Sequence, residues 1–119
     1  MILRLSGYDH LRELPERGDA INPLAPGARE LVQVMVDEVL AITPKPIHFH
    51  LGGDEAWRFG SHPDTRSYIA SHGKAELFLH HYRPLLENLI DKNIRPILWH
   101  DMMHDWEMTP LKEIAGLTD

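Results

Sequence analysis

The sequence predicts an α/β fold. Residues 47–51 form a short apolar run bounded by proline and glycine, and residues 95–101 form a second short run, as is typical of strands. Apolar residues at helical spacing fill residues 74–93 between them, and a similar pattern covers residues 26–42. Strand, helix, strand is a βαβ unit, so we expect two parallel strands joined by a right-handed crossover.

The composition is that of a soluble globular protein. Of the 119 residues, 43% are hydrophobic and 25% are charged. The formal net charge of −6 argues against a nucleic-acid partner. No run approaches the ~18 apolar residues of a membrane span, and residues 1–5 are too short for the apolar part of a secretory signal. We therefore expect a cytoplasmic protein without a membrane partner. Without cysteine, disulfides and thiolate metal sites are excluded.

The first 25 residues show little periodicity. Four leucines in this part could anchor one or two helical turns: Leu3, Leu5, Leu11 and Leu14. Residues 15–26 are rich in glycine, asparagine and proline, which predicts a connector.

A helix is predicted over residues 26–42. Pro26 suits the first helical position, and the prolines at 44 and 46 end the helix because residues before proline avoid the helical region. The predicted buried stripe consists of Ala28, Leu31, Val32, Met35, Val39 and Ile42, and Val34, Val36 and Leu40 widen it.

Residues 56–73 are polar and contain glycine, proline and serine, which predicts a long loop. Loops of this length are uncommon in compact domains and tend to be functional. We expect this loop to wall or cover a site, because it starts directly after a pair of acids.

The clearest helix is predicted over residues 74–93, with a C-terminal cap at Asn93. Pro84 is expected to kink this helix or to break its hydrogen bonding slightly. His81 is expected on its solvated face. A short helix is predicted over residues 109–115, with threonine and proline at its start.

Two parallel strands do not make a stable sheet alone, because parallel sheets need both faces covered. Either other chains contribute strands, or the chain belongs to a larger barrel or doubly wound domain. We favour the second, so the 119 residues are expected to be a fragment.

The candidate site lies where the first strand ends, and this strand is expected to be buried. Side chains alternate along a strand, so His48 and His50 share one face, and Ile47, Phe49 and Leu51 fall on the other, inner face. The glycines at 52 and 53 give the backbone the freedom to leave the strand. The carboxylates of Asp54 and Glu55 can then point into one site.

The second strand ends at Trp99, His100 and Asp101. Parallel neighbours bring their carboxyl ends to the same rim, and this rim is where α/β folds place their sites. We therefore expect the acid pair to meet Trp99 and Asp101.

Residues 50–57 read His-Leu-Gly-Gly-Asp-Glu-Ala-Trp. They match the His-x-Gly-Gly-Asp-Glu signature, and the chain resembles family 20 glycoside hydrolases, the β-N-acetylhexosaminidases. Residues 11–13, the Asn-Pro pair at 22–23 and residues 96–102 look like the hexosaminidase D branch. The resemblance runs over residues 8–103. It implies a (β/α)8 TIM barrel, of which residues 1–119 cover the part from after the third strand to just past the fifth.

The resemblance also implies exo-hydrolysis of terminal N-acetylglucosamine or N-acetylgalactosamine with retention of configuration. In this family the acetamido oxygen of the substrate is the nucleophile, and an oxazolinium intermediate forms. By match to the signature, Glu55 would be the general acid and then the base. Asp54 would orient the acetamido group and stabilise its positive charge. His50, Trp99 and Asp101 would contact the sugar; no cofactor or metal is implied.

Two alternatives stay open. His48 and His50, with the acids nearby, could hold a divalent metal in a barrel hydrolase. The chain could also be a non-catalytic barrel fragment. Trp57 is compatible with packing or with sugar stacking, and Arg12 could reach the site from its loop. No oligomeric state is predicted.

Overall fold

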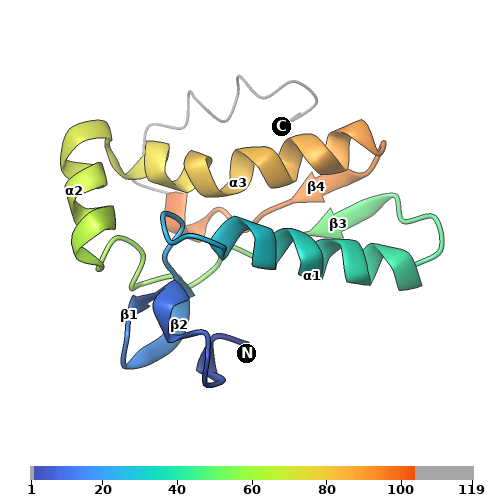
Figure 1. The fold of residues 1–119 in the computed structure, drawn as a ribbon. Coiled ribbons are helices and arrows are strands. Elements are labelled where there is room, and N and C mark those ends of the chain that lie inside the picture. Colours follow the sequence, from blue (N-terminus) through green and yellow to red (C-terminus); the bar gives the residue numbers. More distant parts are fainter. Residues whose placement is uncertain (1, 104–119) are drawn as a thin grey trace.

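The computed structural model describes residues 2–103, so the helix predicted at residues 109–115 lies outside the described part (Figure 1). None of the described helices has the length and hydrophobicity needed to cross a bilayer. The elements in chain order are η1 (Ile2–Arg4), η2 (Asp9–Leu11), β1 (Arg12–Leu14), β2 (Arg17–Ile21), α1 (Ala28–Ile42), β3 (His48–His50), α2 (Pro63–His72), α3 (Lys74–Asp91), β4 (Arg95–Ile97) and η3 (Asp101–Met103).

The predicted α/β class and the βαβ unit are confirmed. β3 pairs with β4 in parallel, with His48 opposite Arg95. The pairing continues past β3, because the Leu51 N–H donates a hydrogen bond to the Ile97 carbonyl at 2.9 Å. Figure 1 shows α1 and α3 running beside this strand pair.

One face of the β3–β4 sheet packs against the helices. Phe49 and Leu51 contact a cluster of buried side chains from α1, α3 and the turn before β4. This confirms two of the three residues predicted for the inner strand face. Ile47, the third, is 73% exposed, because the strand pairing begins only at His48.

The opposite face of this sheet is open in the described part of the chain, although the sequence predicts a buried strand. His48 and His50 are exposed, and so are Ile97 and Trp99. The physical reason is that each of the two strands has a single neighbour, and no second layer covers this face in residues 2–103.

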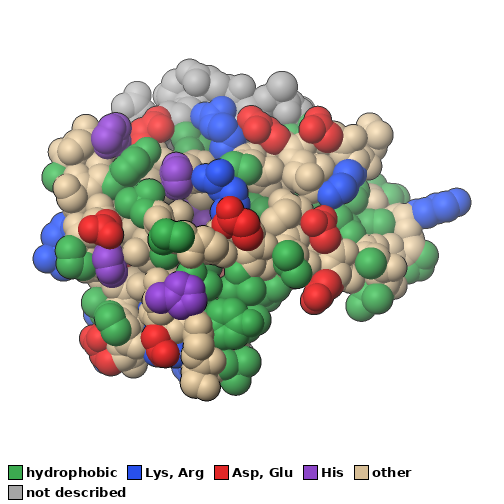
Figure 2. Space-filling model, in the orientation of Figure 1, with side chains coloured by type: hydrophobic (Ala, Val, Ile, Leu, Met, Phe, Trp, Pro, Cys, Tyr) green, Lys and Arg blue, Asp and Glu red, His purple; other side chains and the backbone are tan. Residues whose placement is uncertain are grey.

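Helix α1 begins two residues later than predicted, after Gly27, which adopts φ +88°. The prediction that the whole apolar stripe is buried is wrong. The buried side is centred on Val36, because α3 and the sheet cover only that side. Apolar side chains remain exposed among charged ones on the face of the molecule that carries α1 (Figure 2). On α1 these are Val34, Met35, Val39 and Ile42.

The connector predicted over residues 15–26 contains a strand instead. β1 and β2 form an antiparallel hairpin, in which Arg12 pairs with Ile21 and Leu14 with Arg17. The one or two predicted helical turns are present as η1 and η2, and Leu3 and Leu11 are buried there.

The loop predicted over residues 56–73 contains helix α2. The helix is capped by His62, whose Nδ1 accepts a hydrogen bond from the Asp64 N–H at 3.2 Å. Pro63 occupies the first helical turn, where its missing N–H costs nothing. The irregular loop is therefore limited to residues 51–62.

Helix α3 lies close to the predicted range and continues through Pro84. Asn93, just past its end, adopts φ +58°, as suits a residue that terminates a helix. The prediction that His81 is solvated is wrong. His81 is 7% exposed, because its side of α3 faces β2 and the loop after β3.

Candidate functional site

The chain turns sharply where β3 ends. Gly52 and Gly53 adopt φ +78° and +96°, and Glu55 adopts φ +49°. The Gly52 carbonyl accepts a hydrogen bond from the Trp99 N–H at 3.0 Å, which fixes the start of this turn beside the end of β4. The two glycines thus supply the backbone freedom that the sequence predicts for this exit.

Gly53 is required for a second reason. A Cβ atom at this position would lie 3.1 Å from the Tyr82 hydroxyl and 3.6 Å from Cδ2 of Leu98. The backbone before Asp54 therefore packs directly on the side chain of Tyr82, and any side chain at residue 53 would push the two apart.

A hydrogen bond joins the segment that follows β3 to the segment that follows β4. The Glu55 N–H donates a hydrogen bond to Oδ2 of Asp101 at 3.1 Å. Asp101 is the first residue of η3, which follows β4. The structure thus brings together Glu55 and Asp101, two of the residues that the sequence places at this rim.

His50 and Trp99 lie against each other on the open sheet face. Their ring centroids are 5.0 Å apart, with the planes tilted by 50°. Nδ1 of His50 accepts a hydrogen bond from the Gly52 N–H at 2.9 Å, so this nitrogen carries no proton. The His50 ring is thus turned toward the backbone of the glycine turn.

Trp99 is 54% exposed and so is a surface wall rather than a core residue. Trp57, in the loop after the acids, is 70% exposed. Neither indole is buried among residues 2–103, and Trp99 contacts the ring of His50.

A cavity of about 170 Å³ lies beside Asp54. Ala20 and Ile21 of β2 line one wall, and Ala56 and Phe59 line another. Glu55 is not among its lining residues. The two acids therefore have different surroundings, one facing this cavity and the other held beside Asp101.

Two groups of α3, the half-buried Tyr82 and the buried His81, reach the same cavity, and sequence reasoning missed both as site residues. Burial, and then the carboxylate of Asp54, raise the pKa of Tyr82 to about 12, so its hydroxyl stays protonated. Burial, followed by the positive charges of Arg29 and His80, lowers the pKa of His81 to about 4, so its ring is neutral near pH 7. Asp54 thus has two neutral polar groups near it.

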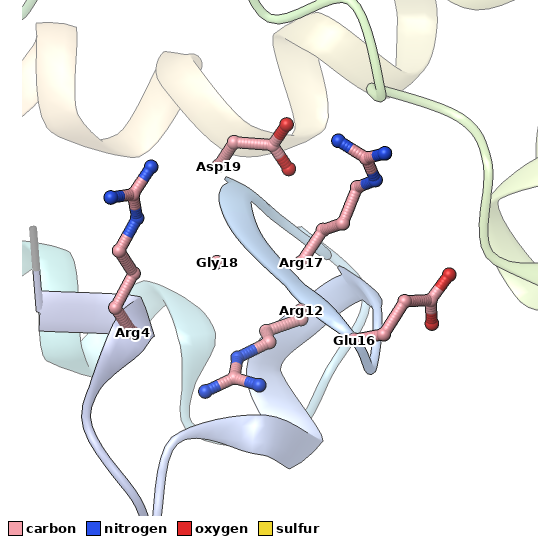
Figure 3. Close-up of a pocket in the computed structure, with 6 residues that line it drawn as sticks. All are labelled: Arg4, Arg12, Glu16, Arg17, Gly18 and Asp19. Atoms are coloured by element: carbon pink, nitrogen blue, oxygen red, sulfur yellow. The ribbon is translucent and has the colours of Figure 1, made fainter.

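A second, more open cavity of about 450 Å³ lies at the β1–β2 hairpin (Figure 3). Arg4 and Arg17 extend on either side of Asp19 in this view. Arg12 does not reach the acid pair. Its Nε donates to the Leu3 carbonyl at 2.6 Å, and its Nη1 contacts the carboxylate of Asp9 at 2.6 Å.

Within residues 2–103, no three histidine or acidic side chains converge in a way that could hold a metal ion. His48 and His50 do share the open sheet face, as predicted, but they do not join the acids into such a group. The described residues therefore give the metal-dependent alternative no support.

Comparison with known proteins gives a consistent result. The chain matches the catalytic-domain model of glycosyl hydrolase family 20 over residues 10–116. It is 28% identical to Hexosaminidase D of Bos taurus over 119 residues, covering 97% of this chain and 34% of that protein. For Hexosaminidase D of Homo sapiens the identity is 27% over 108 residues, covering 87% of this chain and 22% of that protein. The chain thus spans 22% to 34% of the length of these relatives. No solved structure gives a significant match.

Proposed function

The chain belongs to glycosyl hydrolase family 20, and we propose that it carries the catalytic acids of a retaining exo-β-N-acetylhexosaminidase. The substrate class is a glycan that ends in N-acetylglucosamine or N-acetylgalactosamine. The observation that carries the proposal is the glycine turn after β3, which presents Asp54 and Glu55 where the Glu55 N–H binds Asp101. The relatives named Hexosaminidase D support a hexosamine as the sugar.

We further propose that residues 1–119 form part of a (β/α)8 barrel, from after its third strand to just past its fifth. β3 and β4 would be the fourth and fifth strands. The support is the open sheet face with His48 and Ile97, together with the exposed apolar side of α1, since parallel sheets are covered on both faces. A barrel would cover these surfaces with its remaining strands and helices.

In the proposed reaction Glu55 acts first as an acid. It gives its proton to the glycosidic oxygen as the bond to the leaving group breaks, while the acetamido oxygen of the same sugar attacks C1. Glu55 then takes a proton from water, and the water oxygen opens the resulting oxazolinium ring at C1. Two inversions at C1 give net retention.

Asp54 is proposed to hold the acetamido group. Its carboxylate would accept the N–H of that group and stabilise the positive charge that develops on it. The surroundings of Asp54 support this role. Tyr82 adds no competing negative charge, because its hydroxyl has a pKa of about 12.

Trp99 and His50 are proposed to form one wall for the sugar ring. An exposed indole beside an imidazole, with centroids 5.0 Å apart, offers an extended apolar surface to the C–H face of a hexose. Asp101 has one oxygen engaged with the Glu55 N–H, and its second oxygen is proposed to accept a sugar hydroxyl.

The test uses the full-length gene product and two chromogenic substrates, p-nitrophenyl β-N-acetylglucosaminide and p-nitrophenyl β-glucoside. Only the first carries the internal nucleophile, so we expect only the first to be hydrolysed. Proton NMR should detect the β-anomer as the first product. Comparable hydrolysis of the glucoside, or the α-anomer first, would contradict the proposal.

A chelator separates this mechanism from the metal-dependent alternative. Incubation with EDTA should leave the rate unchanged, because no step of the proposed reaction uses a metal. Stoichiometric bound zinc, with activity lost on chelation and restored by zinc, would favour the alternative.

A further inference from the structure

Glu13 is a fully buried acid on β1, with an exposed fraction of 0%. Its Oε1 accepts a hydrogen bond from the Gly60 N–H at 2.9 Å. Its Oε2 accepts from the His62 N–H at 2.7 Å and from the Thr65 hydroxyl at 2.7 Å. All three donors belong to the segment that follows the acid pair and begins α2.

These contacts require a carboxylate. Backbone N–H groups can only donate, so both side-chain oxygens of residue 13 must accept. A glutamine has one acceptor oxygen, and its NH₂ group would face a donor. Burying a carboxylate is costly, and no lysine, arginine or histidine pairs with Glu13 in the part of the chain that the structure describes. The three hydrogen bonds are what offset this cost.

Glu13 joins the two walls of the cavity beside Asp54. β1, which carries Glu13, pairs with β2, and β2 supplies Ala20 and Ile21 to one wall. The loop that Glu13 binds at Gly60 supplies the other wall through residues 56 and 59. The position of the loop relative to the hairpin, and hence the width of the cavity, depends on this carboxylate.

We propose that Glu13 is a positioning residue, which holds the loop of residues 56–62 against the β1–β2 hairpin and thereby sets the affinity of the site for N-acetylhexosaminides. This inference rests on the proposed function for its ligand. Glu13 does not contact the substrate; it acts through the backbone of Gly60 and His62.

A purely structural role for Glu13 makes a different prediction. Loss of a structural contact lowers the melting temperature but leaves the KM of the folded protein unchanged. Loss of a positioning contact raises KM while kcat changes little, because binding to ground state and transition state is weakened equally. Hydrogen exchange at the Gly60 and His62 amides reports their hydrogen bonds to Glu13 directly, without any substrate.

The experiment compares Glu13→Gln with two controls in the full-length gene product. Thr65→Ser keeps the hydroxyl that binds Glu13. Leu89→Ala removes a fully buried side chain of α3 that does not line the cavity. It lowers the stability of the fold and leaves the hydrogen bonds of Glu13 in place. KM and kcat are measured on p-nitrophenyl β-N-acetylglucosaminide, and Kd is measured for N-acetylglucosamine.

In Glu13→Gln we expect KM and Kd to rise about tenfold with kcat within about twofold, since one buried hydrogen bond to a charged group is lost. Amide exchange at Gly60 and His62 should accelerate about tenfold. Both controls should keep the wild-type KM and Kd. If Glu13→Gln does not fold, Thr65→Val removes only the third hydrogen bond and should raise KM and Kd about threefold.

Unchanged exchange at Gly60 and His62 in a folded Glu13→Gln protein would show that Glu13 does not hold this loop in place. Faster exchange with unchanged KM and Kd would overturn the positioning role. A rise of KM in Leu89→Ala equal to that in Glu13→Gln would also overturn it. If the wild-type protein hydrolyses no N-acetylhexosaminide, the proposed function fails, and the exchange and Kd measurements still decide the role of Glu13.

Discussion

The backbone N–H of Glu55 donates a hydrogen bond to Oδ2 of Asp101 at 3.1 Å, across 46 residues of sequence. Glu55 has φ +49°, which is uncommon for a residue other than glycine and costs on the order of 1–3 kcal/mol. The bond to Asp101 helps to hold the backbone in this conformation. It also fixes where the Glu55 side chain begins, relative to β4.

Asp101→Ala should lower kcat about 10- to 100-fold, because the Glu55 backbone loses its acceptor and a small displacement of the proposed catalytic acid is costly. Asp101→Asn keeps an acceptor oxygen and should retain kcat within about fivefold. Steady-state kinetics on p-nitrophenyl β-N-acetylglucosaminide measures both. Equal kcat in wild type and Asp101→Ala would show that this bond does not position Glu55.

Asp54→Asn should lower kcat by roughly 100-fold or more, since the neutral amide cannot stabilise the charge on the acetamido group. The fall should be much smaller in Asp91→Asn, which changes an exposed acid at the end of α3. Both rates are measured at saturating substrate. Comparable rates in the two variants would remove Asp54 from its proposed role.

Gly53→Ala should destabilise the fold more than Gly27→Ala. Both glycines have positive φ, so each substitution costs about 1–2 kcal/mol in backbone strain. A Cβ at residue 27 meets nothing within 4 Å, whereas at residue 53 it lies 3.1 Å from the Tyr82 hydroxyl. We expect about 1 kcal/mol more loss at residue 53, measured by urea unfolding. Equal losses would contradict the packing of Tyr82 on this turn.

His81 should make stability depend on pH. Its pKa is about 4 in the folded state and 6.5 in the unfolded state, because burial disfavours the charged ring. Between these values the unfolded state binds a proton that the folded state does not, so stability falls as pH drops from 6.5 to 4. The loss is up to about 3 kcal/mol and is absent above pH 6.5.

The matched variant is His81→Leu, which cannot titrate. Urea unfolding of this variant across the same pH range should show a shallower decline than in wild type. Parallel curves for the two proteins would mean that His81 does not cause the pH dependence.

The sequence predicts the βαβ unit because its signals are local. The apolar stripe of α3 can be recognised from the residues of that helix alone, and the same holds for the short apolar runs at β3 and β4. The β1–β2 hairpin has no such signal: its strands are defined by pairing with each other. Helix α2 has no apolar stripe, and its N-cap is His62, a residue type that is not among the usual N-cap residues.

The site could be predicted where it depends on strand ends. Topology alone places Glu55 and Asp101 at one rim, and the structure joins them. Tyr82 and Glu13 could not be found this way. Tyr82 fits the core stripe of a helix, and Glu13 resembles a surface acid until the fold buries it. Their roles depend on contacts between segments far apart in sequence.

The most direct test of the proposed catalytic centre is kcat for Glu55→Gln on p-nitrophenyl β-N-acetylglucosaminide, measured in the full-length gene product with folding verified by circular dichroism. The substitution preserves size and removes the transferable proton, so we predict a loss of about 100- to 10,000-fold, as for removal of a general acid–base group. A kcat within about threefold of the wild-type value would contradict the assignment of Glu55.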